Sequence, residues 1–129
     1  MIMKVEISIG ELLDKISILE IKLLNINDEE KSKNVYKELE VLNPYFQDLL
    51  DKYGIEIKGL YIKLSNINKT LWNIEDDIRE KEKAEEFDEE FVELARSVYI
   101  TNDQRAAVKK EINLLTKSEL VEEKSYSNY

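Results

Sequence analysis

"LYIKLSNINKTLWNIEDDIR", residues 60–79, is the stretch that decides the fold class. Apolar side chains recur in it at intervals of three and four residues. They are Leu60, Leu64, Ile67, Leu71, Ile74 and Ile78. Because an α-helix repeats every 3.6 residues, this spacing places all six on one face. The stretch therefore predicts a long helix with one side buried against neighbouring helices.

Three further segments carry the same apolar spacing, which predicts three more helices. The first follows a capping box formed by Ser8 and Glu11. The second ends at Gly54, a residue typical of helix stops. The fourth helix in chain order follows Asp88, which is a suitable N-cap. Their apolar lines are Ile9, Leu12, Ile16, Leu19, Leu23 and Ile26; Val35, Leu39, Leu42, Phe46, Leu49 and Tyr53; and Phe91, Leu94, Val98, Thr101, Arg105, Val108, Ile112 and Leu115.

Pro44 interrupts the second segment, so we expect a kink or a break there, with Asn43 as a new cap. Two fragments, residues 3–7 and 55–58, alternate apolar and polar side chains and are candidates for a short two-strand N-terminal ribbon. The predicted fold is an all-α antiparallel bundle of three to four long helices. We expect residues 1–118 to form this bundle and residues 119–129 to form a polar C-terminal tail.

The amino-acid composition limits the functions that the chain can have. The 129 residues suffice for about one domain. The absence of cysteine and histidine excludes disulfides, Cys/His zinc sites, thiol nucleophiles and histidine acid–base catalysis. The net charge of −9 disfavours a nucleic-acid partner. The N-terminus does not resemble a signal peptide, and no apolar run approaches the ~18 residues of a membrane span. We therefore expect a cytoplasmic protein without a membrane segment.

The charge is unevenly distributed along the chain. Residues 75–93 carry eleven acids against three bases, whereas residues 94–117 have a net charge of +3. One end of the bundle should therefore be acidic and suited to a basic protein partner. Four E-x-x-E pairs resemble the Mg²⁺ ligands of helical nucleotide pyrophosphatases, but in so Glu-rich a chain we interpret them as a solvated face. We expect no metal or cofactor, and Mg²⁺ only if the chain is an enzyme.

Arg105 lies on the inward line of the fourth helix, where a charge needs a partner or a ligand. If the last two long helices fold back on each other near residue 86, the numbers of two residues that face each other add up to about 172. Arg105 then lies near Ile67 and Asn68. By the same rule Glu75 lies near Arg96 and Tyr99.

Polar stripes flank the apolar lines of these two helices, and they have two interpretations. They can form a pocket in which cations hold an anionic group, Trp72 and Tyr99 stack, and Glu75 acts as a base or metal ligand. They can also be flanking salt bridges that set the helix register. The candidate ligand-binding residues are Arg105, Lys109, Asn102, Glu75, Trp72, Arg79, Tyr99 and Asn68.

Three strings resemble an uncharacterised family of small helical proteins from bacteria and marine phages, catalogued as a domain of unknown function. They are VEISIGELLDKISILEIKL, LWNIEDDIREKEKAEEFDEEFVELARSVYITNDQRAAVKKEIN and ELVEEKSY, so the resemblance covers residues 4–24 and 71–126. The matching polar positions are Glu11, Asp14, Lys15, Glu20, Lys22, Trp72, Glu75, Asp76, Arg79, Arg96, Tyr99, Asn102, Asp103, Arg105, Lys109 and Asn113. This polar motif implies a shared site. Some members lie near surface-polysaccharide or glycosyltransferase genes, which implies a role in sugar-nucleotide metabolism. Thr116-Lys117-Ser118 stands where relatives tend to have a glycine before the serine.

Two function classes follow. The first is a non-catalytic binding or assembly module that forms a homodimer through its long amphipathic helices. The alternative is a ligand-binding protein or enzyme for a phosphorylated small molecule, such as a nucleotide or nucleotide sugar. Its ligand would occupy the polar pocket between the helices.

Overall fold

The computed structural model describes residues 1–125, and they form three helices: α1 (Ile9–Asn25), α2 (Glu29–Lys83) and α3 (Glu89–Leu115). No strand occurs within residues 1–125. The all-α prediction is confirmed, with the second and third expected helices merged into α2. No helix in this part of the chain is long and apolar enough to cross a membrane.

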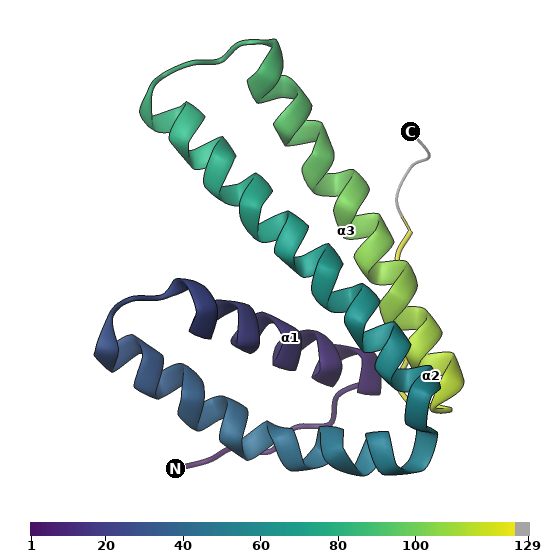
Figure 1. Cartoon of the computed structure of the whole chain (residues 1–129). Coiled ribbons are helices and arrows are strands. Elements are labelled where there is room, and N and C mark those ends of the chain that lie inside the picture. The colour runs from purple at the N-terminus through teal and green to yellow at the C-terminus, as the bar shows by residue number, and fades with distance from the viewer. Residues whose placement is uncertain (126–129) are drawn as a thin grey trace.

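Gly54 divides α2 into two arms, residues 29–53 and 55–83. Its backbone has φ 59° and ψ −132°, a combination that costs strain for any residue with a Cβ. The chain therefore changes direction at Gly54 without a connecting loop. The first arm packs with α1 as one hairpin, and the second arm packs with α3 as another (Figure 1). The prediction of a helix stop at Gly54 is confirmed.

The two hairpins converge at one end and diverge at the other, so the molecule has the shape of a V (Figure 1). The start of α1, the Gly54 bend and the end of α3 meet where they converge. The main buried core consists of Leu13, Ile16, Phe46, Ile57, Leu64, Val108 and Ile112. By contrast, none of residues 69–100 is buried. The core therefore joins the hairpins at the vertex of the V and leaves the far half of the second hairpin as two helices alone.

Side chains cap the starts of all three helices within residues 1–125, at Ser8 and Asp88 as the sequence predicts and also at Asp28. Ser8 Oγ accepts from the Glu11 amide at 3.1 Å. Asp28 and Asp88 accept from amides three residues on, at 2.9 Å each. Each bond satisfies one of the amides that a helix N-terminus leaves without a backbone partner.

The expected ribbon does not form. Residues 3–7 and 55–58 do not pair, because helix resumes after Gly54 and carries Ile57 into the core. Pro44 does not break α2, and Asn43 does not cap a new helix. Pro44 lies on the exposed side of the arm, as does Glu40, whose carbonyl loses its usual partner. Water can satisfy that carbonyl, so the helix continues.

At Gly10 the backbone of α1 lies very close to α3, whereas nothing lies near the Cβ positions of the other two glycines. A Cβ added to it would lie 2.5 Å from the Lys109 carbonyl oxygen and 3.0 Å from Asn113 Oδ1. The same approach lets the Gly10 amide donate to Asn113 Oδ1 at 2.7 Å. The Ile9 amide donates to Ser118 Oγ at 3.2 Å, so α3 and the residues after it cap the start of α1.

The three glycines give a matched stability test. We expect Gly10→Ala to destabilise the fold by ~1–3 kcal/mol through overpacking. Gly54→Ala should cost a similar ~1–3 kcal/mol through backbone strain. Gly59 lies within a helix with nothing near its Cβ position, so Gly59→Ala should stabilise by up to ~1 kcal/mol. Urea unfolding of the three variants measures these changes, and equal effects at all three positions would contradict the account.

Candidate functional site

Asp14 is the point at which all three helices are joined by polar contacts. Its side chain lies on α1 and is only 1% exposed. The Arg105 guanidinium on α3 donates to it through Nε at 2.9 Å and also through Nη2 to the second carboxylate oxygen. Asn68 Nδ2, on the second arm of α2, donates to Asp14 Oδ1 at 2.9 Å. The two-pronged pairing fixes the plane of the guanidinium as well as its position.

Ser17 completes this polar cluster one turn along α1. Asn68 Nδ2 donates to Ser17 Oγ at 2.7 Å, and the Ser17 hydroxyl donates to the Asp14 carbonyl at 2.8 Å. The hydrogen bonds with Asp14 raise the pKa of Arg105, which opposes the lowering by burial. A buried carboxylate costs several kcal/mol unless it is paired. Arg105 was expected to have a partner or a ligand, and the structure gives it a partner, Asp14 on α1.

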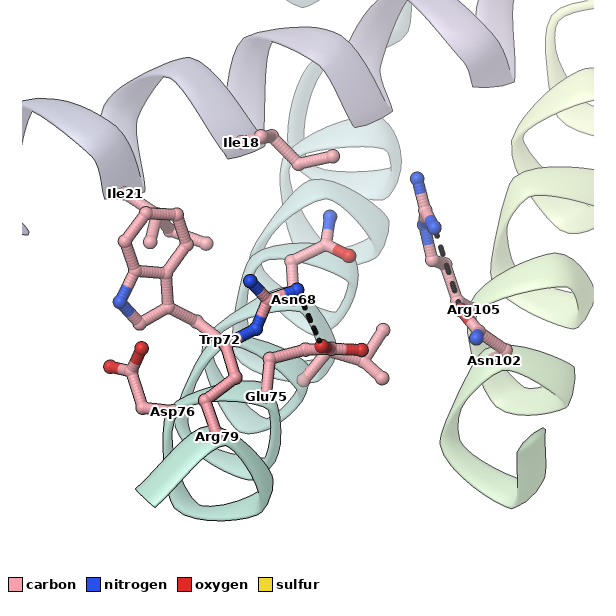
Figure 2. A pocket seen from close by; sticks show the side chains of 10 residues that line it. Ile18, Ile21, Asn68, Trp72, Glu75, Asp76, Arg79, Asn102 and Arg105 are labelled. Carbon is pink, nitrogen blue, oxygen red and sulfur yellow. Dashed lines mark hydrogen bonds and ion pairs between the residues drawn. The ribbon is translucent and has the colours of Figure 1, made fainter. Parts of the chain in front are cut away.

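A groove of about 490 Å³ opens beside this cluster, between α1 and the second hairpin. Figure 2 shows residues of the second arm of α2 facing Arg105 and Asn102 of α3, with α1 alongside. The lining residues are Ile18, Ile21, Asn68, Leu71, Trp72, Glu75, Asp76, Arg79, Asn102 and Arg105. Six of the eight predicted site residues therefore lie in one groove: Arg105, Asn102, Glu75, Trp72, Arg79 and Asn68.

The groove combines cations, carboxylates, amides and one large aromatic ring. Arg79 Nη2 lies 3.3 Å from Glu75 Oε2, and the two side chains are 76% and 46% exposed. Such an exposed pair contributes at most ~1 kcal/mol, so a ligand can displace it easily. Trp72 and Asp76 are one helical turn apart and point to the same side (Figure 2). The groove can therefore offer hydrogen-bond donors, acceptors and a flat apolar face to one molecule.

Two predicted site residues lie outside the groove. Lys109 is 7% exposed, and its Nζ lies 2.7 Å from both Glu11 Oε2 and Glu122 Oε2. Burial lowers the pKa of Lys109, but the hydrogen bonds with the two glutamates outweigh it and raise the pKa overall. Lys109 therefore holds the tail against the start of α1. Tyr99 is 42% exposed and does not line the groove.

Glu75 and Arg96, which the facing rule places near each other, each have an ion-pair partner on their own helix. Glu75 pairs with Arg79, and Arg96 pairs with Glu93 at 3.0 Å, each within its own helix. Side chains three or four positions apart on one helix are close neighbours, so these pairs form without any tertiary contact. In the tail, residues 119–125 have no regular secondary structure, and residues 126–129 lie outside the described part of the chain.

Asp14 was named only through the family resemblance and was not among the candidate ligand-binding residues. Gly10, Asp14, Ser17 and Ile21 follow a 4,3,4 spacing, and all four are buried. This second stripe lies beside the apolar line of α1. It is the sequence pattern that could have identified Asp14. Small and polar residues at helical spacing indicate a second packed face, because they let a neighbouring helix approach closely. Four residues that line the groove were not among the candidates: Ile18, Ile21, Leu71 and Asp76, of which Asp76 belongs to the polar motif of the family resemblance.

No group of three or more acidic side chains within residues 1–125 is placed to share a metal ion. The acidic end of the second hairpin is partly neutralised by Lys81. Its Nζ lies 3.0–3.2 Å from the carboxylates of Glu86, Asp88 and Glu90. The hydrogen bond with Asp88 is the largest cause of a raised Lys81 pKa.

Breaking the Asp14–Arg105 pair should be costly. Arg105→Met leaves a buried, uncompensated carboxylate, and we expect a loss of ~3–5 kcal/mol in the free energy of unfolding. The double variant Asp14→Asn/Arg105→Met should recover part of this loss, because no charge remains and the amide still accepts from Asn68. Denaturant unfolding of the two single variants and the double variant measures the coupling. Arg79→Met is the exposed control, with an expected cost of at most ~1 kcal/mol. A loss no larger than the control's would contradict the account.

Comparison with known proteins places the chain in a family. A family model described as "Family of unknown function (DUF6165)" matches residues 3–129, which includes the middle of the chain that the sequence resemblance did not cover. No curated protein and no solved structure gives a significant match. Because the family model matches nearly the whole sequence, the chain belongs to DUF6165, a family of unknown function.

Proposed function

We propose that this protein is a binding module for a phosphorylated, hydroxyl-rich small molecule of the nucleotide or nucleotide-sugar class. The observation that carries the proposal is the convergence of two arginines, one tryptophan and several polar side chains on one groove between the hairpins. Its volume of about 490 Å³ falls within the range of ~300–1,000 Å³ that is common for ligand sites.

The two arginines suit the phosphate end of such a ligand. Asp14 holds the Arg105 guanidinium in place before any ligand arrives. The third nitrogen, Nη1, makes only a long 3.5 Å contact with Asn102 Oδ1. Arg79 becomes available when its exposed pair with Glu75 opens, at a cost of at most ~1 kcal/mol. Hydrogen bonds to a phosphate are charge-assisted and contribute ~1.5–3 kcal/mol each. Replacing the Arg79–Glu75 pair with contacts to a phosphate is therefore favourable.

The remaining lining residues suit the ring and hydroxyl groups of the ligand. The flat face of Trp72 can stack on a base or pack against the apolar face of a sugar. Glu75, once released, and Asp76 can accept hydrogen bonds from hydroxyl groups, and Asn102 can both donate and accept. The acidic groups also keep the groove close to neutral, which favours a ligand with many hydroxyls over a bare polyanion.

Binding rather than catalysis is the proposed role, because the chain has no histidine or cysteine and the candidate base, Glu75, is paired with Arg79. A cytoplasmic location forms part of the proposal.

A thermal-shift titration with UDP-glucose, GDP-mannose, UMP and inorganic phosphate tests the proposal. A ligand at 100 times its dissociation constant stabilises by about 2.7 kcal/mol, which should raise the melting temperature by several degrees. We expect a shift with a nucleotide sugar and a smaller shift with phosphate alone. Arg79→Met should abolish the shift without unfolding the protein, because Arg79 is 76% exposed.

Arg96→Met is the matched control for this variant. Arg96 also forms an exposed pair with a glutamate of its own helix, at 3.0 Å, but it does not line the groove. It should keep the full shift. If none of the four compounds shifts the melting temperature, or if Arg79→Met binds as well as the parent, the proposal is wrong.

A further inference from the structure

The chain reverses direction after α3, and residues 118–123, here called the strap, run back beside that helix (Figure 1). The reversal occurs at Lys117, whose φ of 52° lies in the left-handed region. The Ser118 amide donates to the Asn113 carbonyl at 2.9 Å, which closes the end of α3. Ser118 Oγ in turn accepts from the Ile9 amide at 3.2 Å. The start of the strap is therefore fixed against both α1 and α3.

Beyond Ser118 the strap is held mainly by charge. Leu120 is 46% exposed and Val121 is 37% exposed. A hollow of about 310 Å³ remains between the strap and the start of α1, so the strap is not densely packed there. Two ion pairs join it to α3: Glu122 with Lys109, and Glu123 with Lys110.

These two ion pairs differ in burial. The Lys109 side chain is only 9% exposed, and its Nζ lies 2.7 Å from Glu122 Oε2. Lys110 and Glu123 are 48% and 70% exposed and lie 3.2 Å apart. A pair as open to solvent as the second contributes little. Glu122 is therefore the residue that holds the strap closed.

Glu122 is also close enough to the groove to affect its charge. Lys109 lies one helical turn from the groove residue Arg105, on the same face of α3. The hydrogen bond with Lys109 is the largest cause of a lowered pKa of Glu122, and the charge of Arg105 lowers it further. Around these two cations lie three carboxylates, those of Asp14, Glu11 and Glu122. The cluster thus has a formal charge of −1 with the strap closed and zero once Glu122 leaves.

We propose that Glu122 is an internal competitor of the groove's ligand, and that the phosphate end of a bound nucleotide sugar releases the strap. This inference rests on the proposed function and adds the regulation of that site. A phosphate on Arg105 and the carboxylate of Glu122 are like charges, so each disfavours the other. Lys109 keeps Glu11 as a partner when Glu122 leaves, at 2.7 Å. Ligand binding and strap release are then coupled in both directions.

Two neighbouring glutamates provide a matched test of the competition. Glu122→Gln and Glu123→Gln each remove one negative charge from the strap and leave the side-chain size almost unchanged. In titration calorimetry with UDP-glucose, Glu122→Gln should lower the Kd by about two- to tenfold, because it removes a charge near Arg105. Glu123→Gln should change the Kd by less than about twofold, because its pair is exposed.

Thiol labelling measures strap release itself. The chain has no cysteine, so Val121→Cys introduces a single thiol on the strap. Adding Glu122→Gln to this variant should speed its alkylation without any ligand, and adding Glu123→Gln should not. UDP-glucose should speed the alkylation of Val121→Cys when Glu122 is present.

Two results would overturn this inference alone: UDP-glucose binding that is equal in the two glutamine variants, or an alkylation rate that neither Glu122→Gln nor UDP-glucose raises. If neither the parent nor Glu122→Gln binds UDP-glucose, GDP-mannose, UMP or inorganic phosphate, the proposed function and this inference both fail.

Discussion

The structure depends on one buried carboxylate. Asp14 is almost completely removed from solvent, and such a charge persists only when it is paired and hydrogen-bonded. Its partners, Arg105 and Asn68, come from the two helices of the other hairpin. The hydrogen bonds that the Asp14 side chain requires therefore determine how the two hairpins pack against each other. The small residues Gly10 and Ser17 lie on the same stripe of α1 and let the helices approach closely enough for these bonds to form.

The same contact shapes the groove. Arg105 is oriented by Asp14 from behind, so its guanidinium is a preformed part of the lining rather than a side chain that must be ordered on binding. α1 contributes the opposite wall through Ile18 and Ile21. The fold thus has a tightly packed vertex, a polar groove next to it, and a far half of the second hairpin where nothing is buried. The buried core is thus concentrated at the vertex, and the groove and the far half of the second hairpin are left open to solvent.

Periodicity predicted which side of each helix faces inward, and the sequence also indicated that Arg105 needs a partner. Six of the eight candidate residues line one groove. Predictions from local sequence patterns were wrong where contacts between distant segments determine the structure. Residues 55–58 alternate like a strand, but Ile57 is required in the helical core. Pro44 is tolerated because it lies on the exposed side of its arm. Lys109 was placed with the groove, but Glu11 and Glu122 draw it to the start of α1. Those glutamates come from distant segments, and no local pattern brings them together.

The most direct test of the central claim is the distance between the two hairpins in solution. Spin labels at Leu24→Cys and Glu86→Cys would report on the ends of the V, and pulsed electron paramagnetic resonance would measure their separation. A dilute sample with excess unlabelled chain isolates the distance within one molecule. If Asp14 sets the angle, the parent gives one narrow distance distribution, and Arg105→Met broadens it while the helices remain folded. A distribution equally broad in both proteins would show that the Asp14 contact does not hold the hairpins together.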